Sequence, residues 1–334
     1  MNKKIAIIGA GSWGTTLAQI LDDNGHEVTL WVRKPTRAQT IKSTRYNSDY
    51  LPAIKLAPSI QITADLNAAV QVASILVLVV PSHGMQTICQ QISANNSCAN
   101  KTIISCTKGF ALDTGQRMSE IIHSTLPAAT LAVLSGPNHA EEIALRQPSA
   151  TVIACADLKL AEKLQQLFLN AYFRPYITDD LIGVEVAGSL KNIIALTSGI
   201  MFGLGFGDNS QAALITRGLA EITRLGVALG ARRETFSGLA GVGDLIATCT
   251  SSHSRNRRAG EALARGETLT TIATSTHMVI EGINATKAAY ALQQTHRVEM
   301  PITESLAQIL FAGKNVQTAL KELMNRSGKQ ELLK

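Results

Sequence analysis

Short runs of apolar residues alternate with longer segments of helical periodicity along the first half of the chain. The runs are rich in Ile, Val and Leu, as is typical of strands that are buried on both faces of a sheet. They predict strands at residues 5–8, 28–32, 60–63, 75–80, 102–106, 131–135 and 151–155. Strands that alternate with helices form a parallel sheet covered on both faces, so this half is predicted to be α/β and doubly wound.

The pattern changes near Asp180, where the strand signals end. Long helical patterns follow, and the first of them covers residues 181–201. A chain of 334 residues with 46% hydrophobic residues is also too long for one typical core. We therefore expect a sheet-containing domain at residues 1–180 and an all-α domain at residues 181–334. The sequence has no repeat, low-complexity tract or flexible linker between them, so a rigid junction is predicted.

The first predicted strand leads directly into a G-x-G-x-x-G sequence at residues 9–14, and a helical pattern follows. Gly9 allows a tight turn, Gly11 lets the backbone approach a pyrophosphate, and Gly14 lets the helix pack closely on the strand. The helix is predicted to end at Asn24 and Gly25, before the second strand. This order predicts a Rossmann-type, dinucleotide-binding domain; the alternative is a tight turn that binds nothing.

The second predicted strand ends where an NAD site usually has Asp or Glu to bind the adenine ribose. This chain has Arg33 and Lys34 there. A carboxylate would repel a 2′-phosphate, whereas these two cations would attract it. The sequence therefore favours NADP(H), with NAD(H) left open as a second cofactor. The alternative is that both cations are merely solvated at a strand end.

The composition argues against several other classes of protein. The five cysteines are scattered without a C-x-x-C pair, which predicts neither disulfides nor zinc and fits a reducing cytoplasm. The seven histidines lack metal-ligand spacing, so no metal is expected. The net charge of +6 is dispersed and only 4% of residues are aromatic, which favours anionic small molecules over nucleic acid. We expect no segment of membrane-spanning length and no secretory signal.

Lys191 is the best catalytic candidate in the predicted all-α domain. Its neighbours one helical turn away are Ala187, Gly188, Ile194 and Ala195, and none is acidic. Most helical lysines are solvated, which is the alternative interpretation. A long cation among small apolar side chains indicates that another group approaches Lys191 closely. Desolvation there would lower the pKa from about 10.4 toward the range that is useful for a general base.

Two further segments indicate a site for an anion. The first is a glycine-rich stretch from Gly238 to Gly243 that ends at Asp244. The second begins at Ser254, a natural N-cap, and has three arginines between residues 255 and 258. Cations are disfavoured at a helix N-terminus, and a bound phosphate would resolve that conflict. The alternative is a solvated run of charge.

These motifs belong to a longer ordered series. Its members are Gly9–Thr15, Ser105–Gly109, Ser135–Pro137 with Ala140–Glu142, Glu185–Asn192, Gly207–Asn209 with Ala213–Gly218, Gly241–Cys249, Ser254–Asn256 and Val279–Gly282. Together they resemble the bacterial-type NAD(P)-dependent glycerol-3-phosphate dehydrogenases over nearly the whole chain. One departure is Asn138-His139, where that family more often has Ser or Thr followed by an aromatic residue.

The resemblance implies reversible hydride transfer between sn-glycerol 3-phosphate and dihydroxyacetone phosphate, with the reduction supplying the phospholipid backbone. It also implies a homodimer. By resemblance, Lys191 accepts the proton of the C2 hydroxyl during oxidation and returns it during reduction. The implied substrate residues are Lys108, Gly136, Asn138, Lys191, Asn192, Asp244, Thr248, Ser254, Arg255 and Asn256. The implied cofactor residues are Gly9, Gly11, Ser12, Trp13, Gly14, Arg33, Lys108, Ala140, Arg255, Val279 and Glu281.

Two rival interpretations are left by the sequence. One is a dehydrogenase of the same two-domain plan that acts on a β-hydroxyacid, but its serine-glycine-glycine segment for a carboxylate is not found here. The other is an NADP-binding sensor or scaffold without chemistry. The presence of Lys191, Asp244 and Arg255 argues against that second interpretation.

Overall fold

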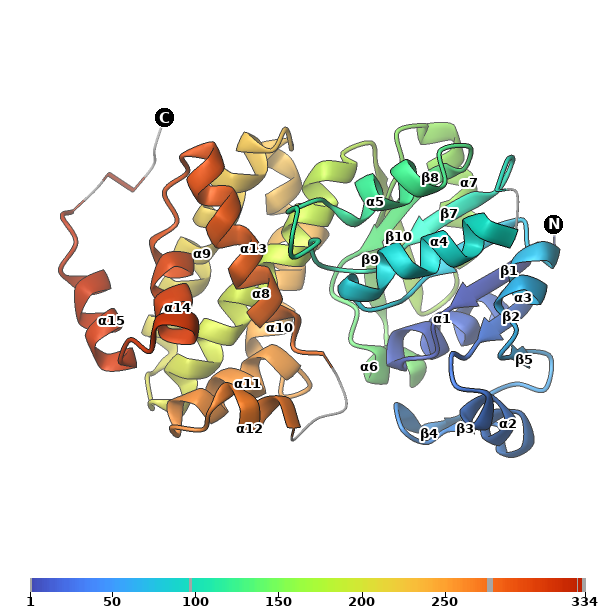
Figure 1. The fold of residues 1–334 in the computed structure, drawn as a ribbon, viewed down its shortest axis with the longest axis horizontal. Coiled ribbons are helices and arrows are strands. Elements are labelled where there is room, and N and C mark those ends of the chain that lie inside the picture. The colour runs from blue at the N-terminus through green and yellow to red at the C-terminus, as the bar shows by residue number, and fades with distance from the viewer. Residues whose placement is uncertain (1, 96–97, 275–278, 329, 332–334) are drawn as a thin grey trace.

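The computed structural model describes residues 2–95, 98–274, 279–328 and 330–331, and it has two halves that lie side by side (Figure 1). The strands are β1 (Lys4–Ile8), β2 (Glu27–Trp31), β3 (Tyr46–Asn47), β4 (Leu51–Lys55), β5 (Gln61–Thr63), β6 (Ile75–Leu78), β7 (Thr102–Ser105), β8 (Thr130–Ser135), β9 (Ser149–Ala154) and β10 (Phe173–Thr178). The helices of the first half are α1 (Ser12–Asp23), α2 (Pro35–Thr44), α3 (Leu66–Val72), α4 (Met85–Asn95), α5 (Met118–Thr125), α6 (Ala140–Ala144) and α7 (Leu158–Phe168).

The second half contains helices and connecting loops, with no strand among its described residues. Its α-helices are α8 (Leu181–Gly203), α9 (Asp208–Ala228), α10 (Asp244–Thr250), α11 (Arg255–Ala264), α12 (Leu269–Thr274), α13 (Glu281–His296), α14 (Pro301–Ala312) and α15 (Val316–Met324). The termini lie at opposite ends of the molecule (Figure 1). The α/β-then-α prediction is confirmed by this arrangement.

The main sheet has the strand order β10-β9-β8-β7-β6-β1-β2-β5. From β5 to β8 all neighbours are parallel, in the order of a doubly wound Rossmann sheet. The prediction of an entirely parallel sheet is wrong at one edge, because β9 runs antiparallel to β8. Strand β10, which pairs with β9 in parallel, and the short antiparallel hairpin of β3 and β4 were not predicted from the sequence.

Alternate residues of β1 enter separate cores on the two faces of the sheet. Ile5 and Ile7 pack with side chains of α1 and α7, whereas Ala6 and Ile8 pack with side chains of α3, α4 and α5. This division follows from the two-residue period of a strand. The layers keep the sheet rigid, so that the loops after its strands can hold fixed positions.

Helix α8 is the centre of the helical half. It is the one helix among the described residues that is long and apolar enough to cross a membrane, so the expectation that no segment reaches that length is wrong. However, 83% of its most apolar window is buried inside the fold, as in the core helix of a globular protein. Small residues let α11 approach it closely, since a Cβ on Gly203 would lie 2.6 Å from the Cβ of Ala264.

The segment between β7 and α5 crosses from the sheet to the helical half. Phe110 in this segment is 2% exposed and belongs to the hydrophobic core that also contains Leu190 and Ile193 of α8. A bridge between Phe110 and Arg117 closes the segment into a loop. The loop therefore starts and ends on the sheet side, but its apolar side chain is buried in the other half.

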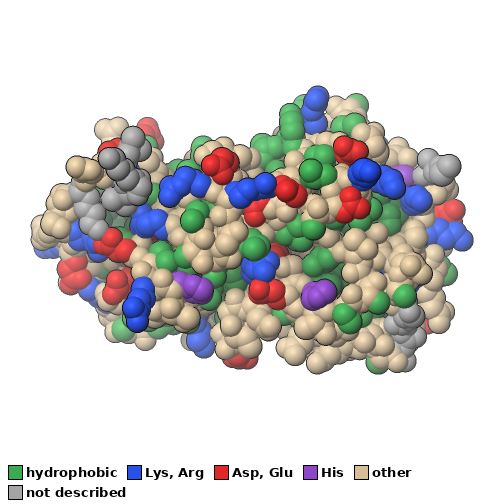
Figure 2. All heavy atoms as spheres, turned by 90° about the horizontal axis from the view of Figure 1, so that it is seen from above, with side chains coloured by type: hydrophobic (Ala, Val, Ile, Leu, Met, Phe, Trp, Pro, Cys, Tyr) green, Lys and Arg blue, Asp and Glu red, His purple; other side chains and the backbone are tan. Residues whose placement is uncertain are grey.

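Charged side chains of both signs are interspersed over the face of the molecule that Figure 2 shows. This distribution agrees with the dispersed cations of the sequence. The expectation that the protein binds no nucleic acid stays a prediction.

Candidate active site

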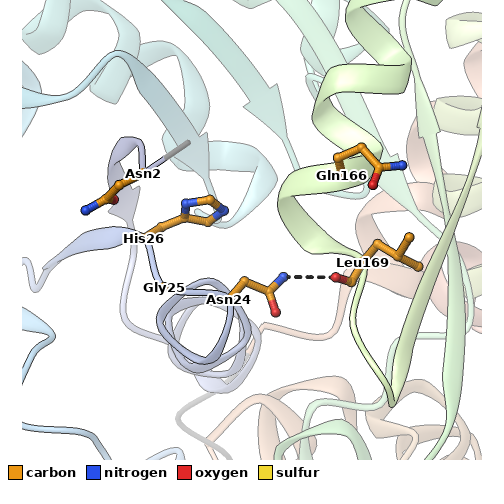
Figure 3. Close-up of a pocket in the computed structure, with 6 residues that line it drawn as sticks. All are labelled: Asn2, Asn24, Gly25, His26, Gln166 and Leu169. Carbon is orange, nitrogen blue, oxygen red and sulfur yellow. Dashed lines mark hydrogen bonds between the residues drawn. The ribbon is translucent and has the colours of Figure 1, made fainter.

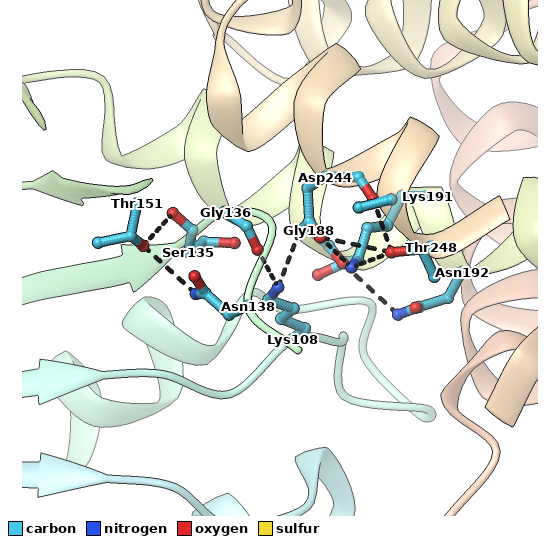
Figure 4. Close-up of polar contacts among 12 residues, drawn as sticks. Lys108, Ser135, Gly136, Asn138, Thr151, Gly188, Lys191, Asn192, Asp244 and Thr248 are labelled. Carbon is cyan, nitrogen blue, oxygen red and sulfur yellow. Dashed lines mark hydrogen bonds and ion pairs between the residues drawn. The ribbon is translucent and has the colours of Figure 1, made fainter. Parts of the chain in front are cut away.

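Loops after β7 and β8 meet helices α8 and α10 where the two halves adjoin (Figure 4). Lys108 follows β7, Gly136 follows β8, and the Lys108 Nζ donates to the Gly136 carbonyl at 2.9 Å. Carboxyl ends of parallel strands are where such sheets bind ligands. The helical half places Lys191 and Asp244 opposite these loops. Four residues that the sequence singled out are thereby brought together.

Lys191 is 6% exposed and lies in the middle of α8. Its Nζ donates to the Thr248 hydroxyl at 2.6 Å and forms an ion pair with Asp244. No acidic residue lies one turn away from Lys191 on α8, and the acid that approaches it, Asp244, comes from α10. Burial is the main cause that lowers the pKa of Lys191, to about 7; the Asp244 carboxylate opposes this and the Lys108 cation adds to it.

Asp244 lies between two lysines. Its Oδ2 pairs with Lys108 at 2.7 Å, and its Oδ1 pairs with Lys191. A short π-helical turn, η3 (Leu239–Gly243), leads into α10 and delivers this carboxylate, which is 1% exposed. One buried carboxylate cannot neutralise two ammonium groups. A site with an uncompensated cation suits an anionic ligand, and it favours the neutral form of one lysine.

Asn192 and Asn256 form a buried pair behind Lys191. The Asn256 Nδ2 donates to the Asn192 Oδ1 at 2.8 Å, and the Gly282 amide donates to the Asn256 Oδ1 at 2.9 Å. Asn256 thus joins α8, α11 and α13. The polar atoms of the Asn256 side chain bond to protein groups. Asn256 therefore lies close to the lysine site, and its contact with the substrate stays a prediction.

The N-terminus of α11 is capped as predicted, because the Ser254 hydroxyl accepts a hydrogen bond from the Arg257 amide at 3.2 Å. The Arg255 Nη1 donates to the Val279 carbonyl at 3.0 Å. Partial desolvation lowers the pKa of Arg255, whereas Glu281 and Glu141 raise it. Arg255 is exposed as a whole residue, so part of it can contact a ligand.

The other arginines in this turn differ from Arg255. Arg257 pairs with Glu261 at 2.9 Å and lies 4.1 Å from the centre of the Phe202 ring, so intramolecular contacts account for it. Arg258 is exposed. The predicted conflict between three arginines and the helix dipole therefore concerns two of them.

The loop after β8 has polar atoms without a partner in the structure. The Asn138 Nδ2 donates to the Thr151 hydroxyl at 3.3 Å, but the Asn138 Oδ1 is buried and has no hydrogen bond. The Ser135 hydroxyl is also buried without one. Unsatisfied buried polar atoms are costly, and at a site they mark positions where a ligand or water can bind.

The glycine-rich turn has the form that the sequence predicted. Gly9 has φ +122°, and a Cβ there would collide with the carbonyl of Val79; a Cβ on Gly14 would collide with the carbonyl of Gly9. By contrast, a Cβ on Gly11 would meet only a Tyr50 ring carbon, at 4.0 Å. Gly11 is the N-cap of α1 and offers no side-chain cap. The space and the free amide groups fit the pyrophosphate of a dinucleotide.

Other residues implied to bind the cofactor lie around this turn and make contacts within the protein. Ser12 donates to the Tyr50 carbonyl at 2.8 Å, and the Ala140 carbonyl accepts from Thr16 at 3.1 Å. The Trp13 ring packs against the sheet core. The contacts of Ser12 and Ala140 are internal, so they shape the turn whether or not they touch a ligand.

Arg33 and Lys34 are exposed directly after β2. Their predicted preference for a 2′-phosphate stays a prediction.

Two polar residues beside the glycine-rich turn, Asn47 of β3 and Arg37 of α2, were not predicted from the sequence. Asn47 and Arg37 donate to the Ala10 carbonyl at 3.0 and 3.2 Å, and Arg37 stacks on the Tyr50 ring at 4.7 Å. Asn47 is a polar residue that is 1% exposed, a burial that no local pattern indicates.

Glu281 connects the two halves at the start of α13. Its carboxylate accepts from the Ser82 amide at 3.2 Å and from the Ser82 hydroxyl at 2.8 Å. Ser82 follows β6, another strand whose carboxyl end faces the junction. Burial raises the pKa of Glu281. The carboxylate therefore fixes the relative position of a sheet loop and a helix beside Arg255.

A hollow of about 340 Å³ lies at the opposite, amino edge of the sheet (Figure 3). Asn2, Asn24, Gly25, His26, Gln166 and Leu169 line it. Its polar groups include one hydrogen bond from Asn24 to the Leu169 carbonyl at 3.4 Å. The amino ends of β1 and β2 lie here, so this hollow is separate from the lysine site. Within the described ranges, no group of three or more His, Cys, Asp or Glu residues could hold a metal ion.

A Rossmann-type sheet, joined at its carboxyl edge to a helical half that buries a lysine of lowered pKa, is the arrangement of a nicotinamide-dependent dehydrogenase. The family model for the N-terminus of NAD-dependent glycerol-3-phosphate dehydrogenase matches residues 4–161, and the model for its C-terminus matches residues 180–321. The chain belongs to this family. The predicted family, fold class and nicotinamide cofactor are thereby confirmed.

Relatives and solved structures agree with the family. A glycerol-3-phosphate dehydrogenase (NAD(P)+) of Enterococcus faecalis is 48% identical over 99% of this chain and 98% of its own. The glycerol-3-phosphate dehydrogenase (NAD(P)+) of a Thermoanaerobacter species is 50% identical over 98% of this chain and 99% of its own. The crystal structure of glycerol-3-phosphate dehydrogenase from Coxiella burnetii superposes with a TM-score of 0.93 at 37% identity, over 97% of this chain and 99% of that one.

Proposed function

We propose that the protein catalyses reversible, NAD(P)-dependent hydride transfer between sn-glycerol 3-phosphate and dihydroxyacetone phosphate. The observation that carries this proposal is Lys191, a buried lysine with a pKa lowered to about 7, in a protein of this family. Such an amine can accept and return a proton near neutral pH. Its ion pair with Asp244 and its hydrogen bond with Thr248 fix the position of the Nζ.

The nicotinamide accepts or supplies the hydride when it is bound. During oxidation, the neutral Lys191 amine takes the proton of the C2 hydroxyl; during reduction, the ammonium returns it to the C2 oxygen. Asp244 stabilises the charged form of Lys191, and Lys108 limits that stabilisation by pairing with the other carboxylate oxygen. The amine can therefore change protonation state in either direction.

The remaining polar residues would bind and orient the substrate. Arg255 is the accessible cation beside the junction and would bind the phosphate. Lys108, Asn138 and Asn192 would contact the hydroxyl groups, with the free Asn138 Oδ1 as an acceptor. Gly136, Thr248, Ser254 and Asn256 would complete this site through backbone and supporting contacts.

The dinucleotide would lie along the carboxyl edge of the sheet. Gly9, Gly11, Ser12, Trp13 and Gly14 would surround its pyrophosphate. Arg33 would favour the 2′-phosphate of NADP(H), and NAD(H) would be the weaker cofactor. Lys108, Ala140, Arg255, Val279 and Glu281 would close the nicotinamide end.

We also propose the setting in which this enzyme works. The Rossmann domain would comprise residues 1–180 and the substrate domain residues 181–334. The reduction would supply glycerol 3-phosphate for phospholipid synthesis in the cytoplasm, and the enzyme would be a homodimer without membrane insertion. The buried thiols, all five of them free, are compatible with a reducing compartment.

The test is the fall of NADPH absorbance when purified protein meets dihydroxyacetone phosphate. We expect turnover with this substrate, and very little with unphosphorylated dihydroxyacetone or with 2-oxo acids of similar size. Turnover of a 2-oxo acid with none of dihydroxyacetone phosphate would overturn the proposal in favour of a hydroxyacid dehydrogenase. NADPH binding without turnover of any substrate would indicate a sensor.

A further inference from the structure

The loop that carries Lys108 is attached to α8 at two points one helical turn apart. The Gly109 amide donates to the Ser189 hydroxyl at 2.8 Å, and that hydroxyl donates to the Glu185 carbonyl at 2.7 Å. The far end of the loop reaches the Glu185 side chain. The same helix carries Lys191, six residues after Glu185 and two after Ser189. The positions of both lysines of the site therefore depend on α8: Lys191 lies on the helix, and the loop of Lys108 is bonded to it.

The Glu185 carboxylate is the centre of the second attachment. It accepts hydrogen bonds from the Ser119 amide at 2.8 Å and from the Ser119 hydroxyl, and it pairs with Arg117 at 2.9 Å. Its side chain is 4% exposed. A buried carboxylate with this set of donors is a strong and specific contact, since the loss of its charge would remove one of the two ion pairs of Arg117, the other being with Glu120 at 2.7 Å.

The two ends of the loop are bonded to each other, so a movement at one attachment to α8 also moves the other. Phe110 and Arg117 form a bridge, and the Ala111 amide donates to the Gln116 carbonyl at 2.9 Å. The Phe110 side chain is buried against α8. A shift of Arg117 would therefore displace Phe110 and, two residues earlier, Lys108.

We propose that Glu185 is a positioning residue that holds the 108–117 loop on α8 and so keeps the Lys108 ammonium on Asp244. This role rests on the proposed function, because Lys108 matters there as a contact of substrate and of Asp244. The hydrogen-bond and ion-pair partners of the Glu185 carboxylate are Ser119 and Arg117, which are not among the residues of the lysine site. Nothing in the reaction proposed above requires Glu185 other than through this loop.

A matched control exists on the far side of the helical half. Glu221 is also buried, and its carboxylate accepts from the Ile302 amide at 2.6 Å and from the Thr303 amide and hydroxyl at 3.2 and 3.1 Å. It holds the first turn of α14, as Glu185 holds the first turn of α5. Glu221→Gln should therefore reproduce the loss of a buried carboxylate without reaching Lys108.

The experiment is a double-mutant cycle on kcat/KM for dihydroxyacetone phosphate. Glu185→Gln in the parent should lower kcat/KM about tenfold, but in a Lys108→Met background it should change the value by less than about twofold, because the residue it positions is gone. Glu221→Gln should leave kcat/KM within about twofold of the parent in both backgrounds. Equal losses from Glu185→Gln with and without Lys108 would overturn the proposal.

A second measurement does not depend on turnover. Hydrogen exchange in residues 105–117 should be faster in Glu185→Gln than in the parent, and unchanged in Glu221→Gln. Ser189→Ala, which removes the hydroxyl that accepts from Gly109 and donates to the Glu185 carbonyl, should speed the same exchange if Glu185→Gln folds poorly. Unchanged exchange in a folded variant would also overturn the proposal. If the parent turns over no dihydroxyacetone phosphate, the proposed function fails, whereas the exchange result still decides whether Glu185 holds the loop.

Discussion

The two sides of the junction recognise ligands by different means. On the sheet side, the glycine-rich turn presents backbone amides and an open space in front of Gly11. On the helical side, the site consists of charged side chains that are buried in mutual contact, with Lys191 and Asp244 as the central pair. Backbone recognition is encoded in a few consecutive residues. The charged site is assembled from helices that are far apart in sequence, and it depends on burial.

This difference predicts where each kind of change should act. Changes on the helical side should alter the proton transfer or the binding of phosphate, and leave the dinucleotide in place. Changes on the sheet side should alter the choice of cofactor, and leave the chemistry intact.

The largest effect is expected from Lys191→Met. Loss of a general acid/base should lower kcat by at least about a hundredfold, while NADPH still binds to the sheet side. Lys108 remains to pair with Asp244, so the variant should fold. Steady-state kinetics and a separate NADPH titration measure the two effects. Lys287→Met, on the exposed face of α13, is the control and should match the parent. Near-parent turnover in Lys191→Met would contradict the assignment.

Arg255→Ala should weaken substrate binding by about 2 kcal/mol, or roughly thirtyfold in KM for dihydroxyacetone phosphate, because an arginine–phosphate pair is lost. The comparison with unphosphorylated dihydroxyacetone shows whether the loss concerns the phosphate. Arg265→Ala, at the other end of α11 and paired with Glu267, should leave KM unchanged. If the variant discriminates between the two substrates as well as the parent does, the phosphate lies elsewhere.

On the sheet side, Arg33→Asp should lower kcat/KM for NADPH by about tenfold or more, equivalent to about 1.4 kcal/mol, while NADH use holds or improves. Both cofactors are compared at saturating dihydroxyacetone phosphate and at two salt concentrations, since salt weakens long-range electrostatic attraction more than direct contact. Lys42→Asp, the same charge change at an exposed position on α2, is the control. An unchanged ratio of NADPH to NADH use would mean that Arg33 is only solvated.

The smallest effect is the pH dependence of the parent enzyme. With the pKa of Lys191 near 7, its neutral fraction rises about tenfold between about pH 6 and pH 8. Oxidation of glycerol 3-phosphate needs the neutral amine and should rise over this range. Reduction of dihydroxyacetone phosphate needs the ammonium and should fall. Values of kcat in both directions at saturating cofactor measure this, and two curves that rise together would identify another titrating group.

The sequence predicted the sheet side better than the helical side. The turn at Gly9 to Gly14 is local, and its glycines have a role that a short motif can encode. Lys191 was also found from local neighbours. Its partner Asp244 is indicated by the residues alone as the end of a glycine-rich segment, and by the family resemblance as a substrate residue; its pairing with Lys191 is not predicted, because an ion pair across 53 residues leaves no periodic signal.

The errors in the sheet have equally physical causes. The residues of β9 have the same apolar pattern in either direction, so the pattern cannot report that the strand is antiparallel to β8. Strand β10 contains Pro175 and exposed Arg174, which weaken a strand signal but are tolerated at the edge of a sheet. Helix α8 was expected from its period, but its great apolarity reflects burial on all sides.

The buried position of Phe110 has a consequence for folding. A boundary near residue 180 separates the chain in sequence, yet the helical core cannot be completed without a side chain from residue 110. Loss of a buried Phe typically costs about 3–5 kcal/mol, a large part of the stability of a domain. The two halves should therefore melt together in one calorimetric transition, and a fragment that begins at residue 181 should be markedly less stable than the same residues within the whole chain.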